Sequence, residues 1–428
     1  MSAQLTILLW LALYFFFPVV DISGHRIIVP EFYTYVVFFM NLKRLRANPL
    51  VVPFFLYAVL FFMTVLFTSL MDGTLINNHD IFMIRNIVQL ILVIFLFDSQ
   101  FARLEKEMNR KQFEYFIFKC LAVLSLPAFM VILQRLNPFG FRNLVISLYK
   151  PAFFFLDASS FASFRYTSVF KDFYTEAVFF LTLIPLLFYF FLKNELNRSW
   201  RVILVVLMLL VYGAQFFVAR TSLMFSPLLV ATTLFFISGL SFAQALRNAI
   251  LFLLLSFPLA LIGAKLLLGG DLVNLEWALE GLAFWQSEPE SMGQAGKAGF
   301  SSYSTMNEWM SNFFQYIKDN PRVLFVPHHD YNLTESANRY LYTDSFYGQE
   351  IYRYGIYGMV SYFLFLLFLI KNLWGKSRMA ILFVVTYAVL NYKGGNVFFM
   401  DKNIYLYAFV FLLLLVYERR YLIKEGQV

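Results

Sequence analysis

Apolar runs recur along almost the whole chain, and short polar segments separate them. Many of the runs are about 16 to 22 residues long, enough for a helix to cross a hydrocarbon core of about 30 Å. We predict helices over the following ranges: 3–20, 29–42, 50–70, 82–97, 113–134, 176–193, 201–218, 222–239, 248–268, 351–371, 379–391 and 403–417. The pattern is typical of an all-α polytopic membrane protein with about twelve transmembrane helices.

Basic residues mark alternate loops between these runs. The basic set of loops carries Lys43, Arg44, Arg46, Arg103, Lys106, Arg110, Lys111, Lys193, Arg198, Arg201, Arg247, Lys371, Lys376, Arg378, Arg419, Arg420 and Lys424. The other short loops carry only Arg26, Arg220, Lys393 and Lys402. Cytoplasmic loops are the ones enriched in Lys and Arg, so we predict that both termini are cytoplasmic.

Three regions follow from this topology. Residues 1–268 hold the first nine helices and an external loop at 135–175; residues 269–350 form the main external loop domain; residues 351–428 hold the last three helices and a cytoplasmic tail. Within the loop domain, Thr305-x-x-Glu308 resembles a capping box, and the apolar residues after it recur at helical spacing until Asn320-Pro321. This amphipathic helix lies either on the outer membrane surface or against the rest of the loop domain.

Composition agrees with the hydropathy pattern. The chain is 60% hydrophobic and 14% charged, against about 25% charged in an ordinary soluble domain. The formal net charge of +8 is explained by the basic loops and does not indicate nucleic-acid binding. The single cysteine, Cys120, lies in an apolar run, which excludes an intramolecular disulfide and favours a core position.

Basic residues on the external side oppose the charge bias, so each raises the question of what it binds. Arg220 stands at a predicted helix start beside Thr221 and Ser222, where a guanidinium, hydroxyls and free N–H groups suit a phosphate; the alternative is an arginine that snorkels to the interface. Arg85 lies just inside the fourth predicted helix, where it binds phosphate or pairs with Asp80 or Asp72.

Two further segments hold candidate residues. Arg165 precedes the sixth helix, together with Lys171 and Glu176, and either contacts a phosphate or orders the loop. Lys265, near the end of the ninth helix, is a candidate of the same kind or a snorkelling lysine.

The segment Thr343 to Gly358, T-D-S-F-Y-G-Q-E-I-Y-R-Y-G-I-Y-G, brings charge, aromatic rings and glycines to the expected membrane boundary. Asp344 is the leading candidate for a general base, and its alternative role is to cap the tenth helix. Its neighbours Arg339, Tyr347 and Arg353 are candidates for substrate contact. His328 and His329 are adjacent and lack further His or Cys partners nearby, so we predict no metal site, although either could act as a base.

Three short pieces of this chain resemble the bacterial O-antigen polymerase and O-antigen ligase superfamily of membrane glycosyltransferases. They are R-x-x-x-x-F-x-x-x-x-x-E from Arg165, A-R-T-S around Arg220, and D-S-F-Y followed by Y-G-I-Y-G, in which Asp344 precedes Gly355 by eleven positions. In ligases the third piece usually begins with His-Asn. Asp344-Ser345 at this place looks more like a polymerase.

The resemblance implies a GT-C-like fold in the bacterial inner membrane and a metal-independent glycosyl transfer without a cofactor. The substrate would be an undecaprenyl-diphosphate-linked glycan at the periplasmic face, joined to an incoming repeat unit to build O-antigen or a related polysaccharide. Arg220, Arg165, Arg85 and Arg339 would hold the diphosphate and Asp344 would take the proton. A chain-length regulator and a flippase of the same pathway would be partners.

Two alternatives remain open. One is an O-antigen ligase, which differs in using lipid A core as the acceptor. The other is a flippase for lipid-linked oligosaccharides, against which the long external loop argues.

Overall fold

A computed structural model describes residues 2–17, 20–22, 25–44, 48–73, 76–149, 168, 170, 173–218, 220–238, 243–244, 247, 251, 313–327, 345–392 and 403–419. The chain divides into two compact units. Unit 1 comprises Met1–Val37, Gln100–Glu288 and Arg420–Val428; unit 2 comprises Phe38–Ser99 and Pro289–Arg419. Each unit is therefore built from stretches that are distant in the sequence.

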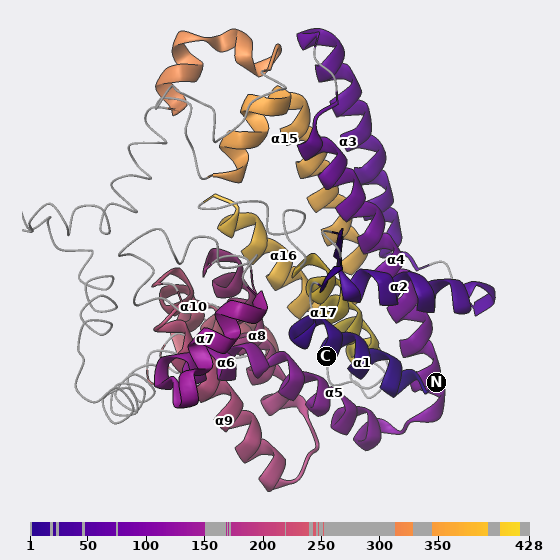
Figure 1. Cartoon of the computed structure of the whole chain (residues 1–428), viewed down its shortest axis with the longest axis vertical. Coiled ribbons are helices and arrows are strands. Elements are labelled where there is room, and N and C mark those ends of the chain that lie inside the picture. Colours follow the sequence, from indigo (N-terminus) through magenta and orange to yellow (C-terminus); the bar gives the residue numbers. More distant parts are fainter. Residues whose placement is uncertain are drawn as a thin grey trace, which may run out of the picture. The chain divides into compact units, whose positions relative to one another are not determined.

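The described chain is overwhelmingly helical, as Figure 1 shows. Its main helices are α1 (Ala3–Phe16), α2 (Val29–Met40), α3 (Val51–Asp72), α4 (Asn78–Glu107), α5 (Arg110–Leu124), α6 (Leu126–Leu136), α7 (Phe141–Tyr149), α8 (Phe173–Lys193), α9 (Arg198–Gln215), α10 (Arg220–Ser238), α15 (Phe346–Leu373), α16 (Arg378–Leu390) and α17 (Asn403–Tyr417). Eleven of the twelve predicted ranges coincide with helices in this set. The range 248–268 lies outside the described residues, apart from residue 251.

Six helical stretches in the described part of the chain are long and apolar enough to cross a membrane: Val51–Asp72, His79–Glu107, Arg110–Leu136, Tyr174–Lys193, Arg198–Gln215 and Phe346–Leu373. Shorter apolar helices accompany them, among them Ala3–Phe16 and Tyr405–Tyr417. These long apolar helices indicate a membrane-embedded protein.

Two local features depart from the predicted pattern. The predicted helix 113–134 is two helices, α5 and α6, because Pro127 lacks an N–H for the helical ladder and the Ser125 hydroxyl donates back to the Leu121 carbonyl at 2.9 Å. The predicted first helix ends early, at Phe16, and an antiparallel hairpin of β1 (Val20–Ile22) and β2 (His25–Ile27) follows it. A further helix, α7, lies within the predicted loop 135–175.

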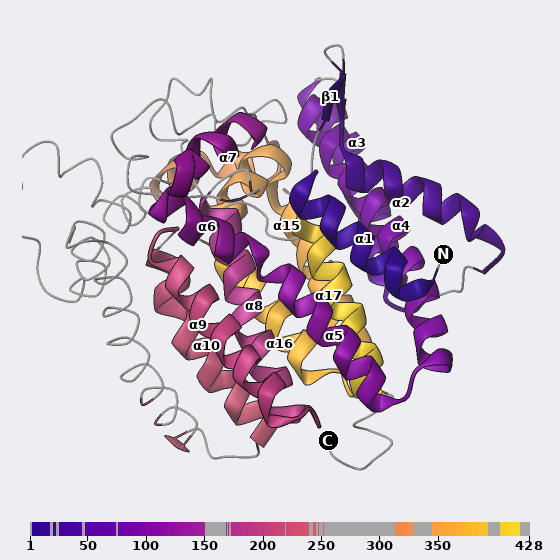
Figure 2. The same ribbon diagram turned by 60° about the horizontal axis from the view of Figure 1, so that its bottom comes forward.

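In unit 1, α8, α9 and α10 pack side by side (Figure 2). The loop 194–197 joins α8 to α9, and α10 begins five positions after α9 ends, so the three helices run up, down and up. Consequently α8 and α10 both begin at the same end of this group, while α9 begins at the opposite end.

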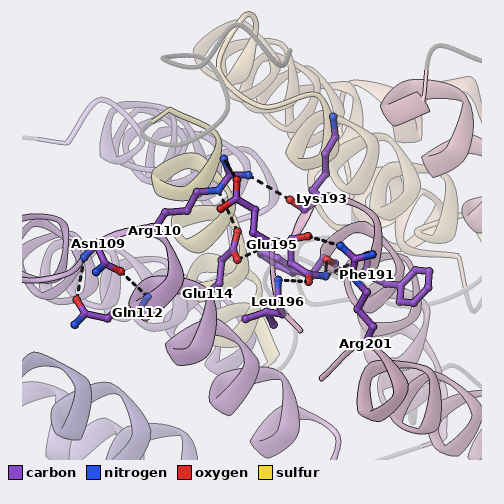
Figure 3. A network of polar contacts seen from close by, with 11 residues as sticks. Asn109, Arg110, Gln112, Glu114, Phe191, Lys193, Glu195, Leu196 and Arg201 are labelled. Carbon is purple, nitrogen blue, oxygen red and sulfur yellow. Dashed lines mark hydrogen bonds and ion pairs between the residues drawn. The ribbon is translucent and has the colours of Figure 1, made fainter. Parts of the chain in front are cut away.

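The loop between α8 and α9 is fixed by a partly buried ionic network (Figure 3). The Arg110 guanidinium lies 3.2 Å from Glu114 and 2.9 Å from Glu195. It also donates to the Lys193 carbonyl at 3.4 Å, and the Glu195 backbone N–H donates to Glu114 at 2.9 Å. Because Glu114 is only 1% exposed, this network anchors the α8–α9 loop on the first turn of α5.

Glu114→Ala is expected to lower the stability of unit 1 by about 3 kcal/mol, because it leaves the Arg110 charge with one fewer partner in a buried setting. Thermal unfolding of the detergent-purified variant measures the loss. Glu107→Ala is the matched control, since its pair with Arg103 spans 4.0 Å on a half-exposed surface and contributes close to nothing. Equal stability of the two variants would contradict the prediction.

In unit 2, α15 packs along α3 (Figure 1). Phe54 and Tyr57 of α3 meet Phe365 at ring-centroid distances of 5.2 and 4.9 Å. A buried hydrogen bond of 3.0 Å joins Thr64 to Ser361 among these rings. Aromatic packing and one satisfied polar pair thus fix the register of the two helices.

The start of α15 is held by α16. The Phe346 N–H donates to the Asn391 carbonyl at 3.1 Å, and the Tyr347 hydroxyl donates to the Ala388 carbonyl. Ser345 occupies the N-cap position, but its side chain makes no capping hydrogen bond. The end of α16 therefore takes over the role that a side-chain cap would have.

Candidate functional site

The structure describes five of the twelve candidate residues: Arg85, Glu176, Arg220, Tyr347 and Arg353. The others lie outside the described residues, and they are Asp344, Arg165, Lys171, Lys265, His328, His329 and Arg339. For Arg220 the structure describes the backbone alone. The candidates divide between the two units.

In unit 1, Arg220 is the first residue of α10. The free N–H groups of the first helical turn therefore adjoin it, as the sequence predicts for a phosphate-binding arginine. Glu176 lies in the first turn of α8, and the up-down-up order places it at the same end of the helix group. The two candidates thus share one end of unit 1.

The Glu176 side chain orders the segment that precedes α8. Its carboxylate is fully buried and accepts hydrogen bonds from the Ser168 backbone N–H at 3.0 Å and from the Ser168 hydroxyl at 2.6 Å. These bonds tie the segment before α8 to the helix. The loop-ordering role predicted for this segment is thus carried by Glu176.

In unit 2, α15 is broken at Gly355. This residue has φ +62° and ψ −151°, a conformation that only glycine adopts readily. The helix is therefore two pieces, 346–354 and 356–373, and the second piece, at about 1.5 Å per residue, is about 27 Å long. The predicted boundary segment is a short helix joined to a membrane helix by a glycine hinge.

Part of the predicted external loop packs against the first piece. A helix over 313–319 ends at Asn320, and the turn η6 (Pro321–Leu324) follows it. Phe313 and Tyr316 meet the ring of Tyr352 at 5.3 and 5.7 Å. Burial raises the pKa of the Tyr316 hydroxyl above its ordinary value. Residues 313–319 therefore pack partly on Val323 of the predicted loop domain and partly on Ile351 and Tyr352 of α15, which lie outside that domain. Met306, Trp309, Met310 and the capping box lie outside the described residues.

The turn η6 explains why residue 355 is a glycine. A Cβ built on Gly355 would lie 2.4 Å from the Leu324 carbonyl oxygen and 3.1 Å from the Leu324 carbonyl carbon. Backbone thus packs on backbone at this point, and a side chain has no room. Gly355 meets both a conformational and a steric requirement.

One turn of α15 and the first turn of α4 form a buried charged cluster of His79, Asp80, Glu350, Arg353 and Tyr354. The Arg353 guanidinium lies 3.0 Å from His79 Nε2, and the Tyr354 hydroxyl donates to Asp80 at 2.5 Å. Asp80 is fully buried and Arg353 is 6% exposed. Glu350, Arg353 and Tyr354 stand at i, i+3 and i+4, which puts them on one face of the helix.

Asp80 also has a local role. Its carboxylate accepts the Asn77 N–H at 2.8 Å, and the Asn77 side chain accepts the Asp80 N–H at 3.0 Å. This reciprocal pair caps α4. The Tyr354 hydroxyl is a further donor to the Asp80 carboxylate.

Glu350 differs from Asp80, the other carboxylate of the cluster, in its hydrogen bonding. It is 1% exposed, and its Oε2 atom has no hydrogen-bond partner within the described residues. A Cβ built on Gly358 would lie 3.1 Å from this oxygen, so the missing side chain of Gly358 gives the carboxylate its space. A buried carboxylate oxygen without a donor is costly and calls for a functional reason.

The remaining described candidates serve other contacts. Tyr347 binds the end of α16, and Arg353 faces His79, so both are part of the packing of unit 2. The side chain of Arg85 is exposed on α4. Within the described ranges, no three His, Cys, Asp or Glu side chains lie close enough together to hold a metal ion.

Glu350, His79 and Tyr354 were not among the site residues predicted from the sequence, and Asp80 was considered only as a partner of Arg85. One signal for Glu350 was available: an acidic residue within an otherwise apolar and aromatic turn, with Arg353 and Tyr354 on the same helical face. The contacts with His79 and Asp80 carry no local signal, because 274 residues separate the partners.

No family model matches this chain, and the curated proteins and solved structures give no match either. The site therefore has to be interpreted from its own residues.

Proposed function

We propose that this protein is a membrane glycosyltransferase that polymerises undecaprenyl-diphosphate-linked oligosaccharide repeat units into O-antigen or a related surface polysaccharide. The observation that carries the proposal is the broken helix α15. Its break falls on the first glycine of Y-G-I-Y-G, the motif that resembles the O-antigen polymerase and ligase superfamily, and a buried charged cluster adjoins it. The start of α10 at Arg220, within the second motif, supports the same proposal.

In this mechanism the anomeric carbon of the growing glycan leaves its diphosphate and joins a hydroxyl of the incoming unit. Arg220 and the free N–H groups at the start of α10 neutralise the charge that develops on the diphosphate. Arg165, Arg85 and Arg339 are further candidates for this contact. Carboxylates near the start of α15 accept the hydroxyl proton, and no metal is required.

A flippase for lipid-linked oligosaccharides is the second candidate, and two observations favour it. Transporters commonly bind substrate at discontinuous helices, and α15 is discontinuous at Gly355. Charged residues buried in a membrane protein also mark transport pathways. An O-antigen ligase would share the chemistry of the polymerase and differ in its acceptor.

Deletion of the gene in the source bacterium separates these functions on a lipopolysaccharide gel. For a polymerase we expect cores capped with a single repeat unit, and recovery of the ladder on complementation. Uncapped cores with accumulated lipid-linked polymer would show a ligase. Uncapped cores with lipid-linked single units held on the cytoplasmic side would show a flippase, and an unchanged ladder would refute all three for this polysaccharide.

A further inference from the structure

We propose that Glu350 is the proton acceptor of the transfer reaction, with Asp80, Tyr354, His79 and Arg353 as positioning residues around it. This inference rests on the proposed glycosyl transfer and replaces the sequence-based choice of Asp344, which lies six positions earlier. The observation behind it is the contrast between two carboxylates of one cluster. Asp80 is fully hydrogen-bonded, whereas Glu350 Oε2 is buried and has no donor within the described residues.

The missing donor defines what Glu350 can bind. A carboxylate oxygen without a partner is an acceptor that a hydroxyl donor satisfies, and sugars present hydroxyl donors. In the reaction the acceptor oxygen forms a bond to the anomeric carbon while the bond from that carbon to the diphosphate oxygen breaks. The diphosphate keeps the electron pair, and the hydroxyl proton goes to Glu350 Oε2.

Glu350 is 1% exposed, so an acceptor hydroxyl reaches it only when the residues that cover it move aside. The break at Gly355 ends the first piece of α15 one residue after Tyr354 and fixes the turn that carries Glu350. Gly358 leaves the space beside Oε2 free of a side chain.

The neighbours of Glu350 account for its orientation. Arg353 attracts the Glu350 carboxylate from the same face of α15, and Asp80 repels it from α4. Arg353 is directed to His79 at 3.0 Å and Tyr354 to Asp80 at 2.5 Å. The other polar groups of the cluster thus hydrogen-bond to one another, and Glu350 Oε2 is left to accept a hydrogen bond from an incoming group.

The test uses full-length protein in nanodiscs and a lipid-diphosphate-linked repeat unit as substrate. Glu350→Gln keeps the shape and removes the proton acceptor, so we expect the polymerisation rate to fall at least about 100-fold. The wild-type rate should rise with pH through the titration of one group, and the residual rate of Glu350→Gln should be independent of pH. Glu350→Asp, which keeps a carboxylate, should retain a pH-dependent rate.

Thermal stability separates this role from a structural one. Because Glu350 Oε2 has no partner to lose, Glu350→Gln should unfold at or above the wild-type temperature. Glu114→Gln is the matched control: Glu114 is equally buried but paired with Arg110, so this variant should unfold at a lower temperature and keep the wild-type rate per folded molecule.

Three results would overturn the inference. The first is a Glu350→Gln variant that polymerises within tenfold of the wild-type rate, and the second is a Glu350→Gln variant that is markedly less stable than wild type. The third is an Asp344→Asn variant that loses the pH dependence of the rate. Failure of wild-type protein to polymerise the substrate at all would instead refute the proposed function.

Discussion

Gly355→Ala is expected to destabilise unit 2 by about 2 to 6 kcal/mol and to abolish polymer synthesis. About 1 to 3 kcal/mol comes from the backbone conformation at φ +62° and ψ −151°. A further 1 to 3 kcal/mol, roughly, comes from overpacking, because the new Cβ would meet the Leu324 carbonyl oxygen at 2.4 Å. Since that oxygen is backbone, the segment 313–327 must move away or α15 must straighten. Thermal unfolding and the polymer ladder on a gel measure the two effects.

Gly73→Ala is the matched control for this substitution. Gly73 also has a positive φ, +68°, at the end of α3, but nothing lies within 4 Å of a Cβ built on it. Gly73→Ala should therefore lower the stability only by the roughly 1 to 2 kcal/mol of the left-handed backbone conformation, and the polymer should still be made. If both variants lose the same stability, the contact with Leu324 has no energetic importance and the break in α15 is a matter of local conformation alone.

The helices could be predicted from the sequence because their signal is local. Apolar runs bounded by polar loops gave 201–218 where the structure has Arg198–Gln215, and 403–417 where it has Asn403–Tyr417. The errors have local causes as well. The break between α5 and α6 follows from Pro127 in a continuous apolar run, and the hairpin after α1 has a strand pattern too short to detect.

The candidate site was predicted less completely, because its contacts join distant segments. The motif at Gly355 pointed to the correct turn of the chain, yet it could not show that Leu324 fills the space beside the glycine. The pairing of Tyr354 with Asp80 depends on how α15 and α4 pack. From the sequence, Asp80 was one of two possible partners of Arg85, and Asp344 was chosen for its position just before the tenth predicted helix.

Arg220→Ala is expected to lower the rate of polymerisation about 100- to 1,000-fold, the usual effect of removing one group that stabilises developing charge in a transition state. Arg220 begins α10, and in the proposed mechanism its charge and the N–H groups of the first helical turn together stabilise the diphosphate leaving group. Arg220→Lys should recover only part of the rate, because an ammonium is a point charge and lacks the bidentate fork.

Arg198→Ala is the matched control, and it decides the meaning of the result. Arg198 is likewise the first residue of its helix, α9, and it is exposed, but the chain direction places it at the opposite end of the three-helix group from Arg220. A helix-capping or general charge effect would impair both variants, whereas a diphosphate site at one end impairs Arg220→Ala alone. Normal polymer from well-expressed Arg220→Ala protein would refute the glycosyl-transfer assignment, because the mechanism would then have lost the group that receives the leaving charge.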